Sequence, residues 1–215
     1  MNQFLLIAMI LLIAIVVVAC YVRRAVHAIL LLSVGSVAVT VVPLAENVAA
    51  YLALPVYDNL LKFLVSVLEL LIAAVVTPGV FYLGVRKTLD VVDTPRIGYR
   101  NTTVVVIVLI VLHLATWVVI QPILMMDLTV LGTVILGVSV SLLMIAIRDD
   151  PFKIMVGLNM AETALFPYLE KTPMAVVPGL LVLIVFVNVV GTYIIYHSYL
   201  EYGVMSVDEW RKMTR

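Results

Sequence analysis

The sequence predicts an all-α integral membrane protein with about seven transmembrane helices, its N-terminus outside and its C-terminus inside. Three observations predict this fold: an apolar composition, seven long apolar runs, and basic residues concentrated on one side of those runs. Of the 215 residues, 65% are hydrophobic and only 12% are charged. A soluble domain does not bury that much apolar surface. We therefore expect a multi-pass protein of the cytoplasmic membrane.

The apolar runs have the length of transmembrane helices. A helix needs about 20 mostly apolar residues to cross the hydrocarbon core, and the runs lack the period-2 alternation of barrel strands. We expect a four-helix N-terminal membrane portion (residues 1–127), a three-helix portion (128–200) and a cytoplasmic tail (201–215). The predicted spans are Phe4–Val22, Ala25–Ala45, Leu60–Leu83, Thr103–Leu124, Leu128–Ile147, Pro151–Leu169 and Ala175–Leu200.

Basic residues set the predicted orientation, because they accumulate on the cytoplasmic side of membrane proteins. With seven spans, eleven of the 13 Lys and Arg residues fall on one side and only Lys62 and Lys171 on the other. Met1 to Gln3 include no basic residue, so the first span is expected to be retained rather than cleaved as a signal peptide. The eleven are Arg23, Arg24, Arg86, Lys87, Arg96, Arg100, Arg148, Lys153, Arg211, Lys212 and Arg215.

Composition also excludes several kinds of function. The net charge is zero, which argues against nucleic acid as a partner. The single cysteine, Cys20, cannot form an internal disulfide and is expected to be a packing residue. The chain has no Gly-rich phosphate loop and no Cys/His cluster, so we expect no cofactor, no metal and no catalytic site of its own.

Four predicted helices place a polar or ionisable side chain near their midpoints. Asp150 can cap the sixth span and Pro151 suits its first position. Glu162 follows eleven residues later, roughly 16 Å along the helix and about half of a ~30 Å core. Counted in the same way, Glu69, His113 and Asn188 also lie near mid-depth.

Such groups are costly in lipid, so they usually face protein or water and often mark ion or proton paths. We interpret Glu162 first, Glu69 second and His113 third as a proton or ion relay. Asn159 lies three residues before Glu162 and therefore on the same helix face; with Asn188 it is expected to support the relay. A row across the membrane plane would suit lateral charge transfer. Each group also has a structural interpretation, as a neutral hydrogen-bonded acid, a packing histidine or an amide that joins two helices.

The segment around Glu162 resembles a known family. VGLNMAETALF, from Val156 to Phe166, is similar to the segment V-G-x-x-x-x-E-N-G-I-F of hydrogenase-4 component E. Val156, Gly157, Glu162 and Phe166 match that segment. Thr163 and Ala164 replace its Asn-Gly, and Leu165 replaces its Ile. The preceding RDDPFK also resembles the charged loop that introduces this helix in the family.

The last three helices, from about Leu128 onward, resemble the K subunit of respiratory complex I and the C subunit of multisubunit cation antiporters. The K subunit carries one carboxylate where this chain has Asn159, one helical turn before Glu162. Its second carboxylate has only Asn188 at a comparable depth here.

The resemblance implies a non-catalytic membrane-arm subunit of a complex I-related redox complex, of group 4 hydrogenase or formate hydrogenlyase type. It implies antiporter-like neighbouring subunits and, indirectly, a nickel–iron and iron–sulfur redox module, together with membrane lipid. The buried carboxylates would then couple redox chemistry to proton or sodium translocation. Two other functions remain open: a subunit of a multisubunit cation/proton antiporter, and a purely structural scaffold subunit.

Overall fold

The computed structural model describes residues 3–124, 129–169 and 176–213. The described residues form helices joined by turns and by a ten-residue loop (residues 88–97), without a β-strand. The predicted all-α membrane fold is therefore confirmed. Leu128, Lys171, Ala175 and Arg215, which the sequence predictions use, lie outside the described residues.

Each predicted span contains a helix, although α1 ends at Ala19, before the predicted end of its span at Val22, and one span combines three helical elements. Among the described residues, five helices are long and apolar enough to cross a membrane, counting Tyr57–Lys87 as one, whereas the apolar α1 has 17 residues. The elements are α1 (Gln3–Ala19), α2 (Ala25–Ala53), α3 (Tyr57–Leu71), the π-helix η1 (Ile72–Val76), α4 (Thr77–Lys87), α5 (Gly98–Leu124), α6 (Thr129–Ile147), α7 (Pro151–Leu169), α8 (Val177–Tyr202) and α9 (Val207–Met213).

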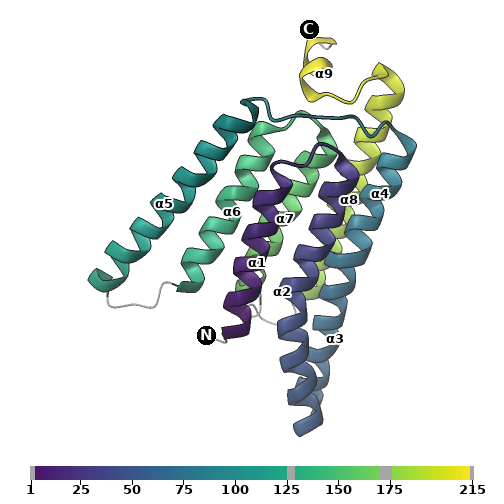
Figure 1. Ribbon diagram of the computed structural model, residues 1–215. Helices are drawn as coiled ribbons and strands as arrows, with labels where there is room; N and C mark the ends of the chain where they lie inside the picture. Colours follow the sequence, from purple (N-terminus) through teal and green to yellow (C-terminus); the bar gives the residue numbers. More distant parts are fainter. Residues whose placement is uncertain (1–2, 125–128, 170–175, 214–215) are drawn as a thin grey trace.

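The helices pack as a bundle in which the two predicted membrane portions interleave (Figure 1). Helix α1 packs against α2 and α6, α2 also packs against α7, and α4 packs against α8. The core between them is apolar and includes Met9, Leu12, Leu32, Met144 and Met160, each 1% exposed or less. Helix α5 lies at the edge of the bundle and leans away from it.

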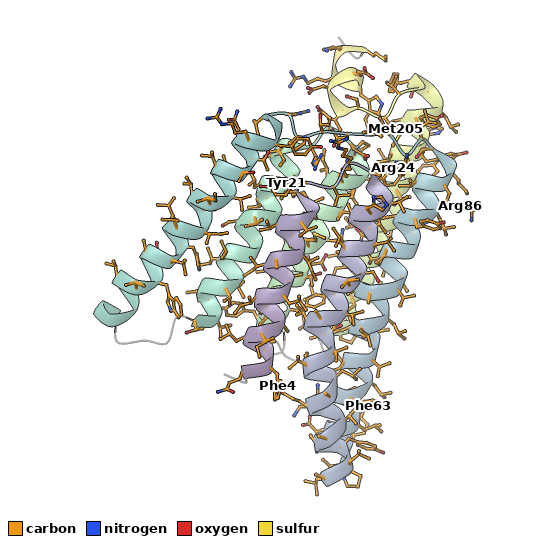
Figure 2. The ribbon with its side chains drawn as sticks, in the orientation of Figure 1. Phe4, Tyr21, Arg24, Phe63, Arg86 and Met205 are labelled. Carbon is orange, nitrogen blue, oxygen red and sulfur yellow. The ribbon has the colours of Figure 1, made fainter. Side chains whose placement is uncertain are left out.

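One end of the bundle, hereafter the basic end, contains the α1–α2 turn, the α4–α5 loop, the α6–α7 turn and α9. Figure 2 shows Arg24, Arg86 and Met205 there, whereas Phe4 and Phe63 lie toward the opposite end. The tail folds back onto this end: Met205 is buried, and the Trp210 indole N–H donates to the Val204 carbonyl oxygen at 2.9 Å.

Helix α2 is longer than the predicted span Ala25–Ala45. It continues through Pro43 as far as Ala53. Neighbouring α3 supports the extension, because Asn47 Nδ2 donates to Ser66 Oγ at 2.7 Å. The loop expected between the second and third spans is consequently only three residues long (residues 54–56).

The third span changes its helical pitch before Pro78. Proline has no backbone N–H, so it cannot donate to the carbonyl four residues earlier, on Ala74. The Ser33 hydroxyl donates to that oxygen instead, at 2.6 Å. A π-turn precedes the proline, in which the Thr77 N–H reaches back five residues to Ile72. The π-turn and the serine together satisfy the backbone without breaking the helix.

Candidate functional site

Glu162 lies on α7 beside a small cavity of about 10 Å³, hereafter the Glu162 cavity. The cavity lies among α2, η1, α4, α7 and α8, and it is close to the smallest volume that holds one water molecule. It combines polar and apolar groups. Its polar lining consists of Ser36, Thr77, Asn159, Glu162 and Thr163, and its apolar lining includes Leu32, Ile72, Phe166 and Leu181.

A closed pair of amides joins the helices at this depth. Asn159 Nδ2 donates to Asn188 Oδ1 at 2.9 Å, and Asn188 Nδ2 donates back to Asn159 Oδ1 at 2.7 Å. The second donor of Asn159 goes to the Met155 carbonyl at 2.9 Å, and that of Asn188 to Thr77 Oγ1 at 3.4 Å. The amides therefore link α7 to α8 and α4, and all four of their N–H donors are used.

Two of the hydroxyl groups around the cavity also form hydrogen bonds. Thr163 Oγ1 donates its single proton to the Asn159 carbonyl at 2.8 Å, and Ser36 Oγ lies 3.4 Å from Thr163 Oγ1. Glu162 Oε1 is buried and has no hydrogen-bond partner among the described residues. An unpartnered buried carboxylate oxygen is costly, so binding a water molecule or a proton would relieve this site.

Glu69 is buried on α3, at 8% exposure. Ile72 and Ala73, which line the Glu162 cavity, follow it by three and four residues. Residues at these spacings share a helix face, so Glu69 faces the same region about one helical turn from the cavity wall. The structure thus brings four of the five predicted residues to one part of the bundle: Glu162, Asn159 and Asn188 directly, and Glu69 one turn away.

His113 lies elsewhere. It is on α5, where a hydrogen bond joins it to the backbone of Gly132 on α6. A Cβ atom at Gly132 would lie 3.1 Å from His113 Nε2, so the glycine permits this close approach. His113 lines a separate cavity between α1, α5 and α6, and it does not line the Glu162 cavity.

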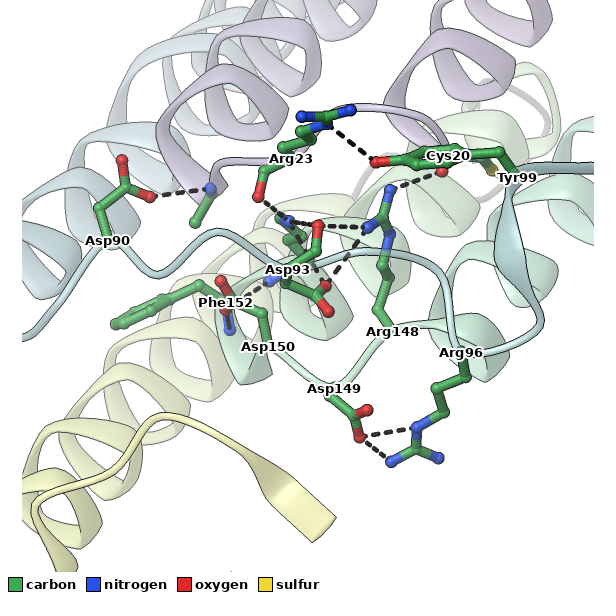
Figure 3. Close-up of polar contacts among 12 residues, drawn as sticks. Cys20, Arg23, Asp90, Asp93, Arg96, Tyr99, Arg148, Asp149, Asp150 and Phe152 are labelled. Atoms are coloured by element: carbon green, nitrogen blue, oxygen red, sulfur yellow. Dashed lines mark hydrogen bonds and ion pairs between the residues drawn. The ribbon is translucent and has the colours of Figure 1, made fainter. Parts of the chain in front are cut away.

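A second polar group, which the sequence analysis did not identify, lies at the basic end (Figure 3). Arg148 and Lys153 are 1% and 0% exposed, and Asp93 Oδ2 lies 3.4 Å from a nitrogen of each. Arg148 also donates to the Cys20 carbonyl, and Lys153 to the Arg23 carbonyl. Together with Asp150, these side chains are hereafter the basic-end cluster. The cluster ties the α4–α5 loop to the α1–α2 and α6–α7 turns.

Asp150 caps α7, as predicted. Its Oδ1 accepts the backbone N–H of Phe152 at 2.8 Å and of Lys153 at 3.3 Å. Burial raises the pKa of this carboxyl to about 6, and nearby Lys153 opposes part of that rise. The α7 cap therefore titrates near neutral pH.

An outer layer of ion pairs covers the basic-end cluster. Arg96 pairs with Asp149 and, at 2.8 Å, with Asp208 of α9. Because Arg96 is in the α4–α5 loop, these pairs hold the C-terminal tail against the same turns. The neighbouring carboxylates raise the pKa of Arg96 above its ordinary value, with the hydrogen bond to Asp149 as the main cause.

Two signals in the sequence could have revealed the missed groups. Ser33, Ser36 and Thr40 recur at spacings of three and four residues, which places hydroxyls along one face of α2. The charged run from Arg148 to Lys153 between two apolar spans could have indicated buried ion pairs at this end, although the carboxylate that pairs with both cations is the distant Asp93.

Neither metal geometry nor a known relative assigns a function to this site. Among the described residues, no group of three His, Cys, Asp or Glu side chains could hold a metal ion. Comparison with models of known protein families, with curated proteins and with solved structures finds no match to this chain.

Proposed function

We propose that this chain is a non-catalytic membrane-arm subunit of a complex I-related redox complex, of group 4 hydrogenase or formate hydrogenlyase type. The observation that carries the proposal is Glu162, an acid among membrane-spanning helices whose buried oxygen has no partner among the described residues. The resemblance of Val156–Phe166 to hydrogenase-4 component E supports the type of complex. Redox chemistry would take place in nickel–iron and iron–sulfur partners, and antiporter-like subunits would lie beside this chain in the membrane.

In this function Glu162 takes up and releases a proton, or compensates the charge of a translocated cation. The N–H donors of the surrounding amides and the O–H of Thr163 are used in other hydrogen bonds, so these groups solvate the ionised Glu162 carboxylate only weakly. A water molecule in the Glu162 cavity would hydrogen-bond the carboxylate and carry its proton. Glu69, one turn from the cavity wall, is the next acid along such a path.

The first test is the identity of the partners. The chain, tagged and purified with its native complex from mild detergent, should co-purify with a nickel–iron subunit, iron–sulfur proteins and antiporter-like subunits. Mass spectrometry of the purified complex identifies them. Recovery with antiporter subunits alone would replace the proposal with the cation/proton antiporter function.

The second test is Glu162→Gln, which keeps the size of the side chain but removes its titration. Proton or sodium uptake into inverted membrane vesicles, driven by the redox reaction of the co-purified module, should fall strongly while the complex still assembles. Glu201→Gln, on the exposed end of α8, is the matched control and should leave uptake unchanged. Full uptake by the assembled Glu162→Gln complex would contradict the proposed role.

A further inference from the structure

A second and larger cavity, of about 260 Å³, lies between α1, α5 and α6. It is hereafter the α5 cavity. Its lining runs from Leu6 to Ile13 on α1, from Ile110 to Trp117 on α5, and from Thr129 to Leu136 on α6. The proposed function assigns nothing to this space.

The α5 cavity is short along the helix axes. Each of the three stretches spans seven residue steps, or about 10 Å at 1.5 Å per residue. That length is about a third of the ~30 Å hydrocarbon core that a transmembrane helix crosses, and the cavity volume of about 260 Å³ is confined to it. A transmembrane helix of a partner therefore cannot enter it, whereas one hydrocarbon chain can.

The lining offers almost no polar atoms to an occupant. The Thr133 hydroxyl donates to carbonyl oxygens of its own helix, on Thr129 and Val130, each at 3.0 Å. His113 is hydrogen-bonded to the backbone of Gly132. A polar headgroup or an ion inside the cavity would lose its hydrogen bonds to water without replacement, so the lining selects an apolar occupant.

The cavity is open to the surroundings of the bundle. Ile10, Leu114 and Trp117, which line it, are 55%, 47% and 38% exposed. Helix α5 is attached at the basic end, where the Tyr21 hydroxyl donates to Thr103 Oγ1 at 3.0 Å, and it leans away from α6 toward its other end (Figure 1). The gap is therefore part of how α5 joins the bundle, and it faces the hydrocarbon region of the membrane.

We propose that the α5 cavity binds one acyl chain of a membrane lipid, which enters from the leaflet at the end opposite the basic end. The lipid headgroup stays outside the cavity, near the N-terminal end of α1. The bound chain fills the space between α5 and the bundle and holds α5 in place.

Native mass spectrometry of the purified full-length chain in detergent tests this proposal. After removal of loosely bound lipid and addition of phosphatidylcholine, the wild type should retain one lipid per chain. Ile10→Trp combined with Leu136→Trp fills the cavity and should abolish this retention. The matched control, Ile7→Trp with Leu142→Trp, changes exposed positions of the same two helices that do not line the cavity, and it should retain the lipid. Equal retention by both pairs would overturn the proposal.

A second measurement leaves the cavity unaltered. Trp210→Phe makes Trp117, on the cavity wall, the sole tryptophan. Phosphatidylcholine with a dibrominated acyl chain should quench its fluorescence saturably, at a lower lipid fraction than it quenches a tryptophan at exposed Val118 (in Trp117→Phe/Val118→Trp/Trp210→Phe). Identical quenching curves at the two positions would show that Trp117 meets only bulk lipid, and would overturn the proposal even if the cavity-filling variant failed to fold.

Discussion

Replacing Asp93 with Asn should destabilise the fold far more than an ordinary surface substitution. Asp93 is 10% exposed, and its carboxylate lies 3.4 Å from both Arg148 and Lys153, whose side chains are fully buried. Removing one partner of a buried ion pair leaves an uncompensated charge and costs about 3–5 kcal/mol. Both cations keep their bonds to backbone carbonyls, so we expect the lower end of that range, about 3 kcal/mol.

The same substitution in an exposed pair provides the control. Asp58 and Lys62 form a salt bridge on α3 with side chains 64% and 37% exposed, and such a pair contributes about 0–1 kcal/mol. Unfolding of the purified protein in detergent, followed by circular dichroism against denaturant, compares Asp93→Asn with Asp58→Asn. Adding Lys153→Met should restore part of the stability lost in Asp93→Asn, because it removes one of the two buried cations that are left without a carboxylate partner. If Asp93→Asn were as mild as Asp58→Asn, the view that the basic-end cluster stabilises this end of the bundle would be wrong.

Two further predictions concern packing and pH. Gly84→Ala should lower the free energy of unfolding by about 1–3 kcal/mol, because the added Cβ would lie 2.6 Å from Thr192 and 2.7 Å from Phe152. Gly79→Ala on the same helix is the control: its Cβ would meet nothing within 4 Å, so this variant should be neutral or more stable by up to about 1 kcal/mol. Thermal unfolding of the two variants checks this, and equal losses would contradict it. The raised pKa of Asp150 means that the folded state binds its proton more tightly than the unfolded state, so this group stabilises the fold below pH 3.8 and loses that contribution as the pH rises to about 6. The loss amounts to up to about 3 kcal/mol. Asp150→Asn keeps a capping side chain and should abolish this part of the pH dependence in unfolding curves measured between pH 4 and 7; an unchanged pH dependence would show that another group causes it.

The positions of the helices could be predicted from the sequence because the length and the limits of each apolar run determine where a helix lies. The predicted span Pro151–Leu169 begins at the residue where α7 begins, since Asp150 and Pro151 are a strong start signal. The end of α2 was placed too early, at Ala45, because nothing local shows that α3 supports the following residues. The hydrogen bond from Ser33 to Ala74, which compensates for Pro78, joins residues 41 positions apart, and no local pattern predicts it.

The depth of the polar groups could also be estimated, but not the direction in which each one points. Counting residues from the helix ends placed Glu162 and His113 at similar depths. The structure puts them on different cavities, because α5 contacts the edge of the bundle whereas α7 lies inside it. Depth depends on the rise per residue along one helix, whereas neighbours depend on how helices pack. The resemblance around Glu162 concerned one segment of α7 and could not supply that packing.

The asparagine pair and Glu162 are hydrogen-bonded differently, and this difference helps to decide whether the polar site is a proton relay or only a structural link between helices. Asn159 and Asn188 show what a structural link between helices looks like, since each amide donor has an acceptor and both side chains are buried. An acid that served only to join helices should be satisfied in the same way. Glu162 instead leaves Oε1 without a partner among the described residues, beside a space of about one water molecule. A scaffold does not need that arrangement, whereas a group that exchanges a proton does. The contrast therefore favours proton exchange as the role of Glu162 and a supporting role for the asparagine pair.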